Sequence, residues 1–117
     1  MIGASCNRVL ATNDPTAHAE VEAIRQAANA RGDFSLKGCT IYTTCEPCPM
    51  CLAAIHWARL DRVVFAMTRR DAQDAGFDDA VIYDAMVRPA VPLERVRSRE
   101  AAEAFRAWAD KPDKRAY

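Results

Sequence analysis

The sequence predicts a single α/β domain, with a small sheet covered by helices. Residues 39–44 and 62–67 are rich in β-branched and aromatic side chains, which is typical of strands. Between them, a helix is predicted from the segment Glu46-Pro47-Cys48-Pro49 to about Arg59. Strand, helix and strand at this length form a βαβ unit, whose strands run parallel with a right-handed crossover. With 117 residues, half of them apolar, the chain can form one core, so we expect one domain over 1–117.

The other elements are predicted from start signals and periodicity. The segment Asn13-Asp14-Pro15-Thr16 predicts the start of a helix, and apolar residues recur at helical spacing from Ala17 to about Ala30. Residues 71–77 are predicted as loop and turn, and the pair Arg69-Arg70 as a solvated turn. The remaining predictions are the end of a strand within 1–9, a short helix over 80–86, an edge strand over 91–96 and an amphipathic helix over 99–109.

Composition and charge exclude several functional classes. Lys plus Arg and Asp plus Glu both number 16, whereas proteins that depend on phosphate contacts usually have a basic excess. A small substrate is therefore favoured over a nucleic acid. No stretch approaches the ~20 apolar residues of a membrane span, and no leader precedes the first helix. Five cysteines, an odd number, without an export signal indicate metal chemistry in the cytoplasm more than disulfides.

Four chemically active side chains are predicted to converge at one end of the sheet. His18 and Glu20 lie in the first turn of one predicted helix, and Cys48 and Cys51 lie in the first turn of the next. The crevice beyond the carboxyl ends of parallel strands is where ligands bind in such sheets. Helix N-termini also carry partial positive charge, which favours the metal-binding thiolate over the thiol.

These four residues have the pattern of a catalytic zinc site. One imidazole and two thiolates hold zinc while leaving a fourth position open for water, whose pKa then falls to roughly 7. Glu20 is not needed as a ligand and is placed to carry a proton from water to substrate. His18-Ala19-Glu20 together with Pro47-Cys48-Pro49-Met50-Cys51 is typical of zinc-dependent deaminases that act on nucleobases.

Two other metal sites are compatible with the cysteine spacing. The Cys-x-x-Cys-x-x-Cys run from Cys45 to Cys51 could hold an iron–sulfur cluster, with Cys6 or Cys39 as the fourth ligand. Alternatively, Cys45 could complete a closed structural zinc site with three cysteines and one histidine. The structural site would leave Glu20 without a role.

Beyond the motifs, nearly the whole chain resembles the bacterial guanine deaminases of the cytidine-deaminase-like superfamily. The segments that carry this resemblance are 13–25, 42–59, 75–83, 105–108 and 114–117. The resemblance implies a three-layer fold with a small mixed sheet flanked by helices. Relative to that family the chain begins late, and we expect it to lack the N-terminal helix and first strand.

The resemblance also implies an activity and roles for particular residues. The reaction would be guanine plus water to xanthine plus ammonia. Zinc would be held by His18, Cys48 and Cys51, with Glu20 as proton shuttle. Asp79 would contact the leaving amino group, although by sequence alone it would be a helix cap. The implied substrate-binding residues are Asn7, Ala19, Trp57 and Tyr117, the last of which would help to close the site.

The implied assembly is a domain-swapped homodimer, in which the C-terminal segment with Asp79 serves the partner's pocket. Guanine would be the small-molecule substrate, with no nucleic acid and no membrane as partner. Two alternative functions stay open. One is a deaminase of adenosine in transfer RNA or of cytosine and nucleosides, and the other is an inactive relative that binds zinc.

Overall fold

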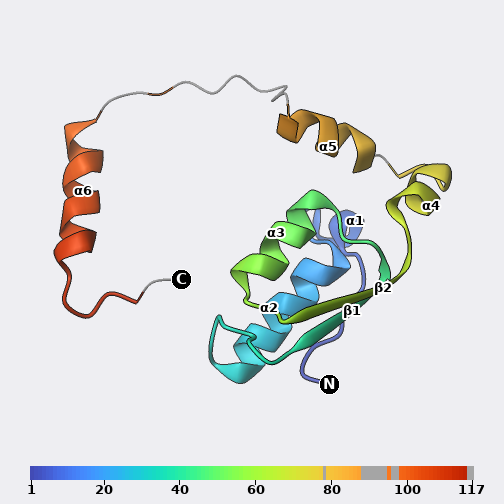
Figure 1. The fold of residues 1–117 in the computed structure, drawn as a ribbon, viewed down its shortest axis with the longest axis horizontal. Coiled ribbons are helices and arrows are strands. Elements are labelled where there is room, and N and C mark those ends of the chain that lie inside the picture. The colour runs from blue at the N-terminus through green and yellow to red at the C-terminus, as the bar shows by residue number, and fades with distance from the viewer. Residues whose placement is uncertain (78, 88–94, 96–97, 116–117) are drawn as a thin grey trace.

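The computed structural model describes residues 1–77, 79–87, 95 and 98–115, and it is an α/β fold as the sequence predicts (Figure 1). The elements in chain order are α1 (Val9–Thr12), α2 (Ala19–Arg31), β1 (Thr40–Cys45), α3 (Pro49–Trp57), β2 (Arg62–Met67), α4 (Arg69–Asp74), α5 (Asp79–Val87) and α6 (Arg99–Asp110).

The centre of the fold is the predicted βαβ unit. β1 and β2 pair in parallel from Thr40 opposite Arg62 to Cys45 opposite Met67, and α3 connects them. The parallel pairing is therefore confirmed. The sheet within the described residues has only these two strands, both parallel. The predicted edge strand over 91–96 lies outside the described residues, apart from Arg95, which is in no strand.

The N-terminal segment differs from the prediction of a strand end. Residues 1–8 form no strand, and the chain turns into the short helix α1 at Val9. The turn forms because the Asn7 side-chain oxygen accepts the backbone N–H of Val9 (3.0 Å). Asn13, in the left-handed conformation, ends α1.

α2 begins two residues later than expected. Asp14 accepts hydrogen bonds from the backbone N–H and the hydroxyl of Thr16, so this predicted start signal forms a turn before the helix. His18 is the N-cap residue instead, and its side chain makes no capping hydrogen bond. At the other end, Gly32 has a φ of 68° and closes the helix by donating its N–H to carbonyls of the last turn. The late start leaves the His18 ring to point away from its own helix end.

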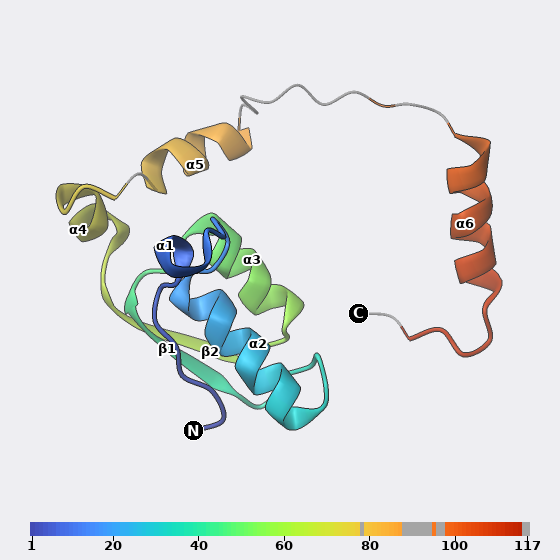
Figure 2. The same ribbon diagram turned by 180° about the vertical axis from the view of Figure 1, so that it is seen from behind.

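The core lies where α2 packs against α3, and both views of the ribbon show these helices side by side (Figures 1 and 2). Ala27, Leu36 and Ala58 form a buried cluster, and Leu36 N–H bonds to Ala58 C=O (2.7 Å). Gly3 brings the N-terminal segment against α2, since a Cβ there would lie 2.7 Å from the carbonyl oxygen of Ala23. These contacts hold α2, α3 and the N-terminal segment together.

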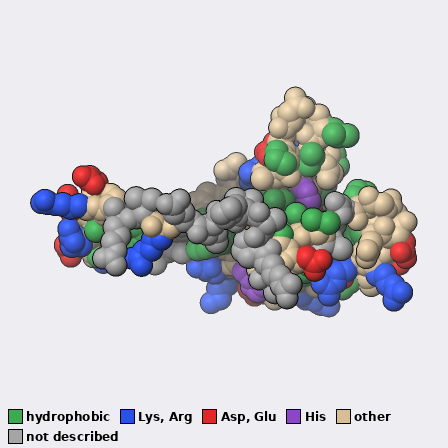
Figure 3. Space-filling model, turned by 90° about the horizontal axis from the view of Figure 1, so that it is seen from above, with side chains coloured by type: hydrophobic (Ala, Val, Ile, Leu, Met, Phe, Trp, Pro, Cys, Tyr) green, Lys and Arg blue, Asp and Glu red, His purple; other side chains and the backbone are tan. Residues whose placement is uncertain are grey.

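Residues 1–67 form the body of the molecule. The described residues from 68 to 115, with α4, α5 and α6, form an arm that extends away from the body (Figures 1 and 3). α4 contradicts the predicted loop and turn, because Thr68 and Asp71 form a reciprocal capping box that starts a helix. The helices predicted over 80–86 and 99–109 are confirmed as α5 and α6 within one residue at each end. Across the described residues, every helix is too short or too polar to cross a membrane.

The arm has an exposed apolar face and one return contact. On α6, the side chains of Phe105 and Trp108 are 78% and 46% exposed. After α6, Arg115 Nη2 lies 2.7 Å from Asp33 Oδ1, and its guanidinium stacks 4.5 Å from the ring centre of Phe34. The arm therefore touches the body near the C-terminal end of α2, while the apolar face of α6 is left to solvent.

Candidate metal centre

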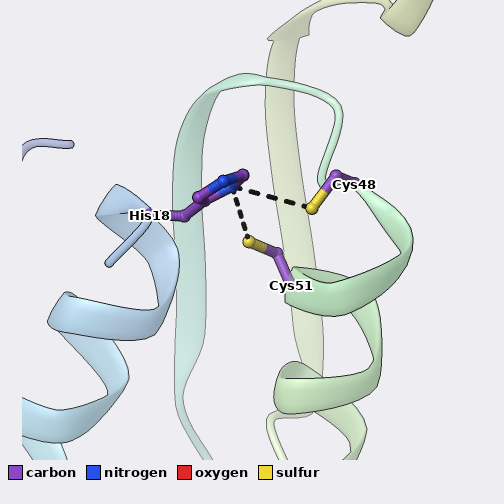
Figure 4. Close-up of side chains that lie close together, drawn as sticks. All are labelled: His18, Cys48 and Cys51. Atoms are coloured by element: carbon purple, nitrogen blue, oxygen red, sulfur yellow. Dashed lines mark hydrogen bonds between the residues drawn. The ribbon is translucent and has the colours of Figure 1, made fainter. Parts of the chain in front are cut away.

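Three potential metal ligands meet at the N-termini of α2 and α3 (Figure 4). His18 is the N-cap of α2 and its side chain makes no capping hydrogen bond, while Cys48 is the N-cap of α3. Cys51 lies in the first turn of α3, where Pro49 occupies the first helical position with a φ suited to it. The predicted convergence of these residues is what the structure shows.

The spacing of the three ligand atoms fits a tetrahedral zinc ion. His18 Nδ1 lies 3.7 Å from Cys48 Sγ and 3.6 Å from Cys51 Sγ, and all three atoms lie within 4.8 Å of one another. Bond lengths of about 2.3 Å to sulfur and 2.0 Å to nitrogen place tetrahedral ligand atoms roughly 3.5–3.8 Å apart. Two soft thiolates and one imidazole are also the donors that zinc prefers.

The two thiols hold their protons very differently in the metal-free protein. The pKa of Cys48 falls from 9.0 to about 6, first because its sulfur accepts a hydrogen bond from the Cys51 side chain. Backbone N–H groups of Cys51 and Met50 and the charge of His18 lower it further. The pKa of Cys51 rises, because its thiol donates that bond, is 0% exposed and lies near the charge of Glu20. One sulfur is therefore already close to the thiolate form that binds metal.

Glu20 lies beside the three ligands without belonging to them. It is in the first turn of α2, half-buried, and close enough to hydrogen-bond with and raise the pKa of the Cys51 thiol. Cys45 Sγ instead lies 3.6 Å from the carbonyl oxygen of Thr68, and Cys39 Sγ lies 3.4 Å from Arg31 Nη1. Within the described residues only His18, Cys48 and Cys51 form a metal-ligating group, which disfavours both the iron–sulfur and the four-ligand zinc alternatives.

The predicted substrate-binding residues have different surroundings. Asn7 is exposed and uses its side-chain oxygen in the turn before α1, while Ala19 is the first, half-buried residue of α2 between His18 and Glu20. Trp57 is 59% exposed at the end of α3, where it lines a shallow hollow of about 420 Å³ with Ala53, His56 and Arg59. The structure thus brings Ala19 to the metal ligands and places Trp57 in a separate hollow.

Two more predicted residues lie at the edge of what the structure describes. Asp79 is the first residue of α5, but its side chain is outside the described part, and Tyr117 is outside it entirely. Conversely, no functional role was predicted for Glu46 and Arg69. These two residues join residues 46–48, here called the metal loop, to α4. The position of Glu46 directly before Pro47-Cys48 was the available signal.

The parallel βαβ unit supplies two cysteines and α2 supplies one histidine, and three such ligands with a fourth coordination position left open define the class of zinc enzymes with a catalytic metal. The chain belongs to the family described as the cytidine and deoxycytidylate deaminase zinc-binding region, whose model matches residues 1–67.

Two kinds of relative are similar to this chain. Guanine deaminase of Bacillus subtilis strain 168 is 47% identical over 95% of this chain and 74% of its own length. The crystal structure of a Bacillus subtilis guanine deaminase covers 100% of this chain and 77% of that one, with 45% identity and a TM-score of 0.93. A tRNA-specific adenosine deaminase of Agrobacterium fabrum is 48% identical over 56% of this chain and 43% of its own length. The cytidine-deaminase-like fold expected from the sequence is thereby confirmed.

Proposed function

We propose that this protein hydrolyses guanine to xanthine and ammonia. The observation that carries the proposal is the extent of the similarity. Similarity to guanine deaminase covers 95% of the chain, whereas similarity to the tRNA-specific adenosine deaminase covers 56%. The matched zinc-binding region ends at residue 67, so α4, α5 and α6 lie beyond it. The arm is therefore the part expected to select the substrate.

The charge of the chain also favours a small substrate. Basic and acidic residues balance at 16 each, whereas binding a transfer RNA depends on Lys and Arg contacts to phosphates. Deamination of adenosine in transfer RNA is the competing candidate, because a tRNA-specific adenosine deaminase is 48% identical over 56% of this chain.

In the proposed reaction, water adds to the ring carbon that bears the amino group, a C–O bond forms and the C–N bond breaks. His18, Cys48 and Cys51 would hold zinc, which would supply a Lewis acid for the attacking water. Glu20 accepts the proton that this water loses and delivers it to the substrate, so that the amino group departs as ammonia. Its position beside Cys51, within the first turn of α2, supports this role.

The remaining roles are proposed from the family resemblance. Asp79 would hydrogen-bond to the leaving amino group, and Asn7, Ala19 and Trp57 would contact the purine. Tyr117 would close the site. Of these residues, Ala19 has the most direct support, because it lies between a metal ligand and the proposed proton carrier.

The experiment follows ammonia release from guanine, adenine, cytosine and their nucleosides by the zinc-loaded protein. We expect guanine turnover alone, reduced by at least about 100-fold in Glu20→Gln with zinc content unchanged. Glu22→Gln is the matched control, since Glu22 is on the same helix and pairs with Arg25 (2.6 Å). Turnover of adenosine or cytosine instead would overturn the guanine assignment, and no turnover of any substrate would support an inactive zinc-binding relative.

We also propose that residues 1–117 act as one domain in a domain-swapped homodimer. The exposed apolar face of α6, with Phe105 and Trp108, supports a partner for the arm. To test the swap, Glu20→Gln and Asp79→Asn chains are refolded together. If each site combines Glu20 of one chain with Asp79 of the other, half of the dimers carry one intact site, which restores roughly a quarter of wild-type activity. Sites built from one chain would restore none.

We propose the cytoplasm as the location of the enzyme. All five cysteines are free thiols, which is typical of a reducing compartment. Localisation of a tagged chain in cell fractions tests this directly.

A further inference from the structure

The metal loop is joined to the arm through Glu46, the residue that follows β1. Its backbone N–H bonds to the Met67 carbonyl (2.8 Å), which extends the pairing of β1 and β2 by one step. Its side chain then crosses to the start of α4, where Oε2 accepts the backbone N–H of Arg69 (3.0 Å). Only Pro47 separates Glu46 from the metal ligand Cys48. The loop that carries the ligand is therefore fixed to β2 and to α4 at the same residue.

Arg69 continues this connection into α5. Its Nε lies 3.8 Å from Glu46 Oε1, and its guanidinium carbon lies 4.6 Å from the ring centre of Tyr83. A guanidinium that stacks on an aromatic face while its edge meets a carboxylate has both its plane and its direction fixed. Arg69 thus links Glu46, beside the metal ligands, to the middle of α5.

The contacted position on α5 shares a face with the proposed catalytic acid. Asp79 begins α5 and Tyr83 follows four residues later, and residues four apart lie on one face of a helix. Holding Tyr83 therefore sets the rotation of α5 about its axis, and with it the direction in which position 79 is presented. A small error in such a direction is costly for catalysis.

We propose that Glu46 and Arg69 form a positioning pair that orients α5, so that Asp79 meets the leaving amino group of the purine. This inference rests on the proposed function. Neither residue touches the substrate or the metal ligands in this scheme, and both act through α5. In the swapped dimer, the pair beside one zinc loop would orient the acid that completes the other site.

If the pair only stabilised the fold, its removal would lower the melting temperature or the zinc content, and a positioning role predicts neither change. The Arg69 side chain is 54% exposed, and an ion pair at such exposure contributes little to the free energy of unfolding, because water screens it. Removal of the guanidinium should therefore leave the melting temperature and zinc content nearly unchanged. A fall in kcat under those conditions reflects position, not stability.

The first experiment compares Arg69→Met with Arg70→Met in the zinc-loaded, full-length protein. The described contacts do not join Arg70 to Glu46 or Tyr83, so it provides a matched control with the same substitution one residue away. We expect kcat on guanine to fall roughly 10- to 100-fold in Arg69→Met with little change in KM, and Arg70→Met to resemble wild type. Amide hydrogen exchange in 79–87 should accelerate in Arg69→Met alone.

The second experiment asks whether Arg69 acts through Asp79. If it does, the double variant Arg69→Met, Asp79→Asn is no slower than Asp79→Asn alone, because the acid is already absent. At Tyr83, Leu should lower kcat and Phe should restore it, since Phe keeps the aromatic face.

Three results would overturn the proposal: equal kcat values for the two arginine variants, multiplicative losses in the double variant, or loss of zinc from Arg69→Met. Failure of the proposed function is a separate result, because then the wild-type protein itself does not release ammonia from guanine.

Discussion

The body that carries the metal ligands and the arm that follows it are held together by different forces. Every buried hydrophobic residue identified in the described structure lies between Ala17 and Ala58, in the body. The arm helices instead form through local contacts, such as the capping box at Thr68 and the Arg99–Glu103 pair (2.9 Å) on α6. The comparison teaches that the metal site depends on burial within one chain, whereas the arm keeps its apolar face available.

The largest expected effect comes from replacing a metal ligand in the body. Cys51→Ala removes a fully buried sulfur that lies 3.6 Å from His18 Nδ1. We expect loss of bound zinc and, because metal binding is coupled to folding, a loss of body stability on the order of several kcal/mol. Metal analysis and thermal unfolding measure both. Cys6→Ala, at an exposed cysteine, is the control and should retain zinc.

The next effect contrasts a core leucine with an arm phenylalanine. Leu36 is 2% exposed inside the body cluster, so Leu36→Ala should cost about 2–5 kcal/mol of unfolding free energy. Phe105→Ala should change body stability by less than about 0.5 kcal/mol, because its side chain is mostly exposed. Urea unfolding at a protein concentration that favours monomers makes the comparison. A large cost for Phe105→Ala there would mean that α6 packs on its own body.

A smaller effect is expected from pH, which should change the zinc affinity of the body without changing the helicity of the arm. Because the pKa of Cys48 is lowered to about 6, its thiolate is present above that pH and is lost as the pH falls through it. Cys51, whose pKa is raised, still carries its proton at neutral pH. Zinc binding at pH 8 should therefore release about one proton, and more protons as the pH falls through about 6, so affinity then falls more steeply with pH.

Calorimetric titration with zinc in buffers of different ionisation enthalpy counts these protons. Release of two protons at pH 8 would contradict the lowered pKa of Cys48. The helicity of the arm, followed by circular dichroism of a peptide spanning 98–115, should not depend on zinc at either pH.

The smallest effect concerns the start of the arm. Thr68→Ala removes the hydroxyl that accepts the Asp71 N–H (3.3 Å) and should destabilise α4 by about 1 kcal/mol. We expect faster amide exchange in 69–74 and an unchanged melting temperature of the body. A lower melting temperature would show that α4 is part of the cooperative body and would weaken the contrast between the two regions.

The site could be predicted from sequence because its determinants are local. His18 and Cys48 are helix N-caps, and a βαβ crossover brings the end of β1 and the start of α3 to one edge of the sheet. The ligand set, the parallel pairing and the helices over 79–87 and 99–110 all follow from such short-range rules.

The parts that could not be predicted depend on contacts between distant residues. Arg69 was expected in a solvated turn, because nothing near it in sequence indicates that Glu46, 23 residues earlier, meets its N–H. α4 was missed because Thr68-x-x-Asp71 precedes no apolar run. Trp57 stays a predicted purine contact, and the structure shows it 59% exposed in a hollow that it lines with Ala53, His56 and Arg59.

The close approach of Gly3 to α2 has a consequence for which substitutions the chain can accept. At Gly3 the obstacle is the backbone carbonyl of Ala23, 2.7 Å from where a Cβ would lie, and a helix backbone cannot move aside. At Gly32 the surroundings are open and only the φ of 68° is restrictive, so asparagine can replace glycine there at modest cost. Over evolutionary time, position 3 should stay glycine while position 32 alternates between glycine and asparagine.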